Sequence, residues 1–433
     1  MKPLQTIITA FLLLGLLSGA SLATTNVATA LVIAPQAKPE FQHLKWKNKT
    51  IKIAVSNSLT RFSSNIKSDS DVLGAIRRSL QAWSNVADVD LQFEISDRQS
   101  VSPSGPAGDG VSLITIAQTA ENILFFSKDA DSASAKTRIF FNRKGVITEA
   151  DIVLNPYEQF STDGTYGTFD LESTLTHEIG HLLGLHHSAV LGATMAESFA
   201  KNGTMGLTDF GPRTLAESDI AAIRELYGAR AANAENCCGT ISGRLTTLAG
   251  RPGKGLQVWA EEMSSGRVGA QADTALDGTF RIGGVAPGEY LLYWKTKDPS
   301  LASSMGEIGN VTVDLGENKA FNEKIVPRSA EINLQYLGVN GQLADYGITL
   351  NSGRSYLINL GGKNLDPKSV KISFATQRIT SQMPITPVAF GEGVSGINFL
   401  ITIDPDITPG QYSIFASDEN GAGAALVGAL NIE

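Results

Sequence analysis

The stretch HEIGHLLGLHH, residues 177–187, holds four of the five histidines of this 433-residue chain. Apolar residues recur at helical spacing from Leu171 to Leu182, and Asp170 precedes them as a suitable N-cap. Gly184 suits the left-handed position that ends a helix. The stretch therefore predicts a helix that begins after Asp170, carries histidines in its C-terminal half and turns sharply at Gly184.

The spacing of these histidines predicts a metal centre. His177 and His181 are four residues apart, so both imidazoles project from one face of the helix. The H-E-x-x-H-x-x-G-x-x-H spacing assigns the third ligand to His187, with the neighbouring His186 as the alternative. Zinc catalysis needs three protein ligands, an open position and a carboxylate base, and Glu178 beside the first ligand fits that last role.

The motif resembles that of the metzincin zinc peptidases, and within them the matrixin family. Ser188 follows the last histidine as in matrixins, and Met195 stands where the family has its Met-turn methionine, an apolar floor below the metal. LAESDIAAIRELYG, residues 215–228, resembles the closing helix, in which Asp219 matches the aspartate that ties this helix to the Met-turn. The resemblance covers about residues 47–229 and implies an α+β peptidase domain with one catalytic zinc.

The sequence also departs from the family pattern. AESFA after Met195 stands where many matrixins have the proline and tyrosine that shape the S1′ wall, so the specificity pocket is not carried over. Only His43 lies outside the histidine cluster, which leaves no histidines for a second, structural zinc. Frequent Asp and Asn in the loops leave room for structural calcium, although no segment spells a calcium loop. No cysteine precedes residue 237, so we expect no cysteine switch.

The rest of the first domain mixes strands and helices. A helical pattern runs from Asp71 to Trp83, and another from Leu215 to Tyr227. Thr137–Asn142 is a candidate edge strand, along which an extended substrate would pair. Short β-type runs lie at Thr50–Val55, Leu91–Ile95, Leu113–Ala117 and Ile123–Phe126.

Beyond the small, polar stretch ARAANAEN the pattern becomes all-β. Residues 237–327 resemble the transthyretin-like carboxypeptidase regulatory domain, with a hairpin expected at the Asp277–Gly278 turn. Residues 328–433, from near Pro327, resemble immunoglobulin-like IPT/TIG domains. The adjacent Cys237 and Cys238 are read as two incidental thiols, with a vicinal disulfide or an intermolecular bond as alternatives.

The chain is expected to be exported. Lys2 precedes an apolar run from Ile7 to Leu17 that is too short to span a bilayer, which predicts a cleaved signal peptide and no transmembrane anchor. Retention in a periplasm or at a cell surface stays open. We expect a signal peptide at 1–23, a short segment at 24–46, a catalytic domain at 47–229, a linker at 230–236 and β-sandwiches at 237–327 and 328–433.

The predicted function is a secreted zinc-dependent endopeptidase that acts on proteins or peptides, with Glu178 as general base. The alternative is a secreted adhesion or matrix-binding protein with a vestigial zinc site. Either protein could attach to a surface or matrix through its β-sandwiches. A net charge of -8 and a pI near 5.3 argue against nucleic acid as a partner.

Overall fold

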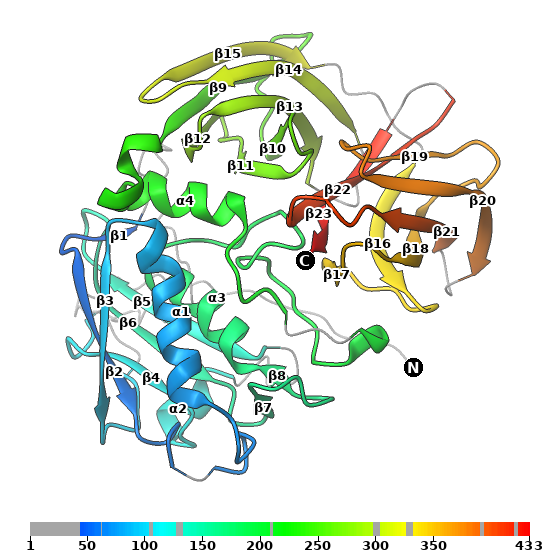
Figure 1. Cartoon of the computed structure of the whole chain (residues 1–433). Coiled ribbons are helices and arrows are strands. Elements are labelled where there is room, and N and C mark those ends of the chain that lie inside the picture. The colour runs from blue at the N-terminus through cyan, green and yellow to red at the C-terminus, as the bar shows by residue number, and fades with distance from the viewer. Residues whose placement is uncertain are drawn as a thin grey trace, which may run out of the picture.

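The computed structural model describes most of the chain beyond residue 43. The described ranges are 44–61, 63–103, 107–126, 133–207, 211–297, 304–325, 332–389, 394–419 and 423–433. The predicted signal peptide, most of the segment 24–46, His43 and Pro327 lie outside these ranges. Figure 1 shows a mixed helix and strand part in blue to green, followed by one β part in green to olive and another in yellow to red. This arrangement confirms the predicted α+β domain followed by β-sandwiches.

A six-stranded sheet forms the centre of the first part. The strand order is β1-β6-β4-β2-β3, all parallel, and β5 pairs with β6 in the antiparallel direction. Among the described residues β5 has no second partner strand, so one of its edges is open. The strands are β1 Lys45–Trp46, β2 Thr50–Ser56, β3 Asp90–Ser96, β4 Ser112–Thr115, β5 Ala135–Phe141 and β6 Val146–Leu154, with the short parallel pair β7 Phe160–Ser161 and β8 Phe169–Asp170 nearby.

Two helices pack together against this sheet. α1 (Val72–Val86) is capped by Asp71, whose carboxylate accepts a hydrogen bond from the Gly74 amide. α3 (Leu171–Leu182) contacts both α1 and β5. Their apolar faces meet in one core that contains the fully buried Trp83. α4 (Glu217–Tyr227) ends this part of the chain. The predicted helices at these three places are thus confirmed.

One predicted strand is wrong. The first two residues of the run Ile123–Phe126 end a short helix, α2 (Ala120–Leu124), and the last two form a turn, so the run contains no strand. The Thr119 hydroxyl accepts a hydrogen bond from the Asn122 amide and so caps the helix. The Asn122 side chain is buried and donates to the carbonyls of Gln99 and Ala117. The local Thr119 cap favours a helical turn over extended backbone, and the bond from Asn122 to the distant Gln99 holds the turn in place.

Residues 239–325 form a two-layer β-sandwich, here called the second module. One sheet has the order β11-β10-β13-β14 and the other the order β12-β9-β15. Side chains between the layers, among them Trp294 and Phe280, form a separate core. The strands are β9 Gly239–Thr247, β10 Leu256–Glu262, β11 Val268–Asp273, β12 Thr279–Val285, β13 Gly288–Thr296, β14 Met305–Val313 and β15 Asn318–Ile325.

Residues 332–433 form a second sandwich, here called the third module. Its sheets have the orders β16-β18-β21-β20 and β17-β23-β22-β19 around a core that includes Phe399. The strands are β16 Asn333–Val339, β17 Ile348–Leu350, β18 Ser355–Lys363, β19 Lys371–Ser373, β20 Ile379–Ala389, β21 Ser395–Ile403, β22 Gly410–Ser417 and β23 Gly423–Ile432.

The turn at Asp277–Gly278 differs from the prediction. Gly278 has a φ of +83° and turns the chain as expected, but β12 pairs with β9 and not with β11. The turn therefore carries the chain from one sheet of the sandwich to the other, and the predicted hairpin is wrong. Sequence alternation identifies a strand and its buried face, but it does not identify the partner strand.

The junction between the first part and the second module is short and structured. The stretch predicted as a linker contains a 3-10 helix, η2 (Ala231–Asn236). Cys237 is joined to Cys238 by a disulfide, so the reading of this pair as two incidental thiols is wrong and the alternative of a vicinal disulfide is the one observed. A second 3-10 helix, η1 (Thr204–Gly206), lies in the loop between α3 and α4. Within the described ranges, none of the helices has the length and apolarity that crossing a bilayer requires.

Candidate metal centre

Helix α3 positions the first two histidines. Its N-cap, Asp170, accepts a hydrogen bond from the Ser173 amide, as the sequence predicted. One turn of helix separates His177 from His181, and their ring centroids lie 4.6 Å apart. The Nδ1 atom of His177 lies 2.8 Å from the Thr194 carbonyl oxygen, and that of His181 lies 2.8 Å from the Leu185 carbonyl oxygen. These bonds place a proton on Nδ1 and leave each Nε2 lone pair available to a metal.

The turn after α3 brings the third histidine to the same point. Gly184 adopts a φ of +98°, and a Cβ there would lie 2.1 Å from the Leu44 carbonyl oxygen, so only glycine fits. The candidate ligand atoms of His177, His181 and His187 all lie within 4.8 Å of one another. His186 is not among them, and among the described residues these three form the only such group of His, Cys, Asp or Glu.

The electrostatics of the cluster favour neutral imidazoles. Burial lowers the pKa of His177 well below its ordinary value, and it lowers the pKa of His181 to about 4. Burial also lowers the pKa of His187, although nearby Glu197 acts in the opposite direction. Neutral imidazole is the form that ligates a metal. The donor set and its protonation therefore fit a zinc ion with three histidine ligands.

Glu178 directly follows His177 on α3, and its side chain is buried. Its carboxylate accepts a hydrogen bond from the Thr137 hydroxyl, which belongs to the edge strand β5. Burial raises the pKa of Glu178 to about 7. A carboxyl group with a pKa near neutrality can both accept and return a proton, as a general base requires.

Met195 and Asp219 both lie close to the elements that carry the cluster. A Cβ at Gly180 would lie 2.3 Å from the Met195 sulfur and 2.8 Å from Trp83 Cζ2, so the glycine lets Met195 pack directly against α3. The Asp219 carboxylate accepts a hydrogen bond from the Thr194 amide at 2.8 Å. Since the Thr194 carbonyl contacts His177, Asp219 is connected to the first candidate ligand through one residue.

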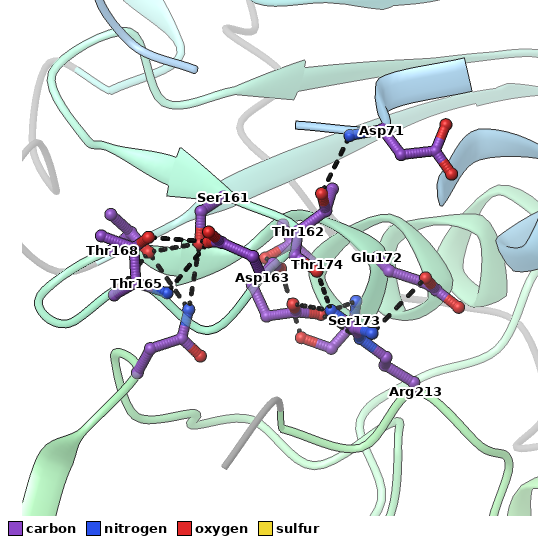
Figure 2. Close-up of polar contacts among 12 residues, drawn as sticks. Asp71, Ser161, Thr162, Asp163, Thr165, Thr168, Glu172, Ser173, Thr174 and Arg213 are labelled. Atoms are coloured by element: carbon purple, nitrogen blue, oxygen red, sulfur yellow. Dashed lines mark hydrogen bonds and ion pairs between the residues drawn. The ribbon is translucent and has the colours of Figure 1, made fainter. Parts of the chain in front are cut away.

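A polar network fixes the N-terminal end of α3. Arg213, which precedes α4, donates two hydrogen bonds to the Asp170 carboxylate and a third to the Thr162 carbonyl oxygen. Figure 2 shows Arg213 beside Ser173 and Glu172 at this end of the helix. The loop that begins at the Met-turn is thereby anchored at its far end to the helix that carries the candidate ligands.

Sequence reasoning missed several residues that shape the site. Thr137 appeared only as the start of a candidate strand, and Thr194 and Gly180 were not considered. Phe199 was noted as a departure from the family, yet its ring packs edge-on against His177 with centroids 4.9 Å apart. The Thr194 contact is made by a backbone carbonyl, which leaves no signature in the sequence.

Comparisons with known proteins agree on the first part of the chain. The family model described as Matrixin matches residues 45–228. Metalloendoproteinase 1 of Glycine max is 50% identical over 64 residues, covering 14% of this chain and 17% of that protein. Metalloendoproteinase 1-MMP of Arabidopsis thaliana is 28% identical over 192 residues, covering 42% of this chain and 44% of that protein. The chain thus spans less than half the length of either relative.

One solved structure that matches the chain overlaps with it only weakly. The Bacteroides ovatus mixed-linkage glucan utilization locus SGBP-B, in complex with a mixed-linkage heptasaccharide, is 14% identical with a TM-score of 0.18. The match covers 41% of this chain and 37% of that chain. A score this low does not place the two chains in one fold.

Proposed function

We propose that the protein hydrolyses peptide bonds in extracellular proteins, because residues 45–228 match the matrixin family model and resemble zinc metalloendopeptidases. The observation that carries the proposal is the meeting of three imidazoles at one point, with the buried Glu178 directly following the first of them on α3. The alternative, an adhesion protein with a vestigial zinc site, is not favoured, because every group that the reaction needs is in place.

In the proposed reaction His177, His181 and His187 hold one zinc ion. When bound, zinc supplies Lewis-acid chemistry, which polarises a peptide carbonyl and makes a water molecule acidic enough to lose a proton near neutral pH. Glu178 accepts that proton and returns it to the leaving amine. The Thr137 hydroxyl orients the Glu178 carboxylate toward this task. Met195 and Asp219 act on the candidate ligands only through packing and the backbone of Thr194.

We propose that the substrate lies extended along the open edge of β5. Main-chain groups on an unpaired strand edge can pair with a peptide as an added strand. The strand covers Ala135–Phe141, close to the expected Thr137–Asn142, and its Thr137 contacts the proposed base directly. Pairing of this kind favours loops or unfolded segments of a protein substrate.

The setting of the enzyme is also a proposal. Export is proposed from the apolar run Ile7–Leu17 behind Lys2, and attachment to a surface or matrix is proposed for the two β-sandwiches. Structural calcium has no further support. Among the described residues, no three Asp or Glu carboxylates lie close enough together to hold a metal ion.

The full chain, purified and loaded with zinc, tests the proposed activity on a library of peptides that covers many cleavage sites. We expect cleavage that a chelator abolishes and added zinc restores. Mass spectrometry of the products would give the cleavage preference at the same time. A chain that binds one zinc per molecule and leaves the whole library intact would contradict the proposed function.

A further inference from the structure

The third module contacts the segment between the third candidate ligand and the Met-turn. The amides of Leu191 and Gly192 donate to the carbonyls of Val427 and Gly428 on β23, both at 2.9 Å. In return the Leu191 carbonyl accepts a hydrogen bond from the Gly347 amide at 3.0 Å. Segment 190–192 is therefore bonded through its backbone to residues that lie far beyond the catalytic domain.

These backbones approach so closely that only glycine fits. Gly347 has no positive φ, yet a Cβ there would lie 2.6 Å from the Gly192 nitrogen and 2.7 Å from its Cα. A Cβ at Gly428 would lie 2.3 Å from Val190 Cγ1. Backbone atoms cannot move aside as a flexible side chain does. The fit between the third module and segment 190–192 therefore depends on the absence of side chains.

An apolar cluster joins all three parts at the same place. It combines residues beside the Met-turn and at the start of α4 with residues from the second and third modules. These residues are Val190, Ala193, Ala216, Trp259, Val268, Ala425 and Val427. Arg267 of the second module borders the cluster, where it contacts Glu217 of α4 and donates to the Pro409 carbonyl of the third module.

Segment 190–192 is connected directly to the candidate ligands. His187 precedes it by two intervening residues, and the Ser188 amide donates to the Met195 carbonyl at 2.6 Å. Thr194, two residues after the segment, accepts the hydrogen bond from His177. A displacement of segment 190–192 would therefore move His187 and the orienting partner of His177 together.

The loop after the Met-turn makes a second contact with the third module. Met205 is 5% exposed and belongs to the core of that module. The side-chain amide of Asn340 donates a hydrogen bond to the Met205 carbonyl oxygen at 2.7 Å. A cavity of about 50 Å³ lies between this loop and residues 346–349. Phe199 lines the cavity and also packs against His177, so the loop connects the third module with the metal centre.

We propose that the third module is a positioning element of the metal centre, which holds segment 190–192 and the loop 198–207 in the shape that zinc and substrate need. Its positioning residues are Gly347, Gly428 and Asn340. The inference rests on the proposed function only where kcat and KM are measured. Zinc release and amide hydrogen exchange can be measured without any substrate.

Gly347→Ala in the full chain tests the proposal. Its Cβ pushes on the backbone of Gly192, whereas the matched control Gly361→Ala crowds Leu343 and Tyr336 inside the third module. We expect Gly347→Ala to lose zinc to a chelator about 10-fold faster and to lower kcat on a short peptide, because changes beside metal ligands cost 10- to 100-fold in affinity. We expect Gly361→Ala to lower the thermal midpoint while zinc release stays within about twofold of the parent.

Hydrogen exchange in the metal-free protein gives an independent measure. Amides 188–195 should exchange faster in Gly347→Ala and remain protected in Gly361→Ala. If the parent binds zinc but cleaves no peptide, the proposed function fails while zinc release and exchange still decide this inference. Equal zinc release and equal exchange in the two variants would overturn it.

Asn340→Gly is the second variant, for the case that Gly347→Ala does not fold. Asn340 has a φ of +54°, which glycine tolerates, so the change removes mainly the hydrogen bond to Met205. We expect a raised KM and an altered cleavage preference with unchanged zinc release, because the loop 198–207 relaxes while segment 190–192 stays in place. A parent-like KM and preference in this variant would contradict the role assigned to the loop.

Discussion

The candidate metal centre has two halves that are held in different ways. His177 and His181 lie on α3, where the N-cap Asp170 and the packing of Trp83 keep the helix in place within the catalytic domain. His187 lies on a segment whose backbone bonds reach Gly347 and β23 of the third module. The helix half is thus complete within residues 44–228, whereas the loop half depends on residues more than 150 positions away in sequence.

The difference shows what a sequence motif can and cannot report. A motif records side chains that take part in chemistry, and it records them for both halves equally well. The support of the loop half consists of backbone hydrogen bonds and missing side chains, which a motif does not contain. Variants that act on one half and not on the other can therefore separate the chemistry of the site from its positioning.

The largest effect is expected from Glu178→Ala in the helix half. Loss of the general base should lower kcat by about 100- to 10,000-fold, while the three histidines continue to bind zinc. The measurements are kcat on a short peptide and zinc content per chain. A variant that keeps zinc and most of its activity would show that another group takes the proton.

The third ligand gives the next largest effect, in the loop half. His187→Ala should weaken zinc binding by more than about 100-fold. Substitution of a residue that only orients a ligand already lowers metal affinity about 10- to 100-fold, and His187→Ala removes the ligand itself. His186→Ala is the matched control and should retain zinc, because its ring is not part of the cluster. Titration with a competing chelator measures both variants. Full zinc retention in His187→Ala with loss in His186→Ala would reverse the assignment.

The sequence predicted the helix half almost completely. Asp170, Gly184 and the four-residue spacing of the histidines act locally, within one helix and its two ends. The run Ile123–Phe126 was mispredicted because its shape depends on Asn122, a buried amide that bonds to residues over 20 positions away. The bond between Leu191 and Val427 spans 236 positions and involves no side chain, so no local pattern could have predicted it.

Gly180→Ala acts where the two halves meet. Alanine favours a helix over glycine by about 0.5–1 kcal/mol, but its Cβ would lie 2.3 Å from the Met195 sulfur and 2.8 Å from Trp83. Overpacking of a core costs about 1–3 kcal/mol, so we expect a net loss of stability and faster zinc release. The loss should be less than additive with Met195→Ala, which removes the sulfur. An increase in thermal midpoint would show that the halves are not in tight contact.

Glu261 tests the support of the loop half from a distance. Its carboxylate lies in the second module and accepts a hydrogen bond from Trp259, which packs in the cluster beside Val190 and Ala193. Burial raises the pKa of Glu261 to about 7. Burial also raises the pKa of Tyr293, and the charge of nearby Glu261 adds to that rise. The folded state therefore binds a proton at Glu261 more tightly than the unfolded state does, so ionisation of this residue destabilises the fold.

The smallest effect on the metal centre is expected from Glu261→Gln. The stability that protonated Glu261 contributes is fully present below pH 4.5 and is lost as the pH rises through about 7. Glutamine cannot ionise, so the variant should match the parent at about pH 4 and exceed its stability by at most about 3 kcal/mol at about pH 8. Thermal midpoints at the two pH values measure this difference. Zinc release at pH 8 should slow only slightly, because Glu261 acts on segment 190–192 through Trp259 and not through the ligands. An identical pH dependence in the two proteins would mean that Glu261 is solvated, and that the cluster beside the Met-turn is looser than its buried side chains indicate.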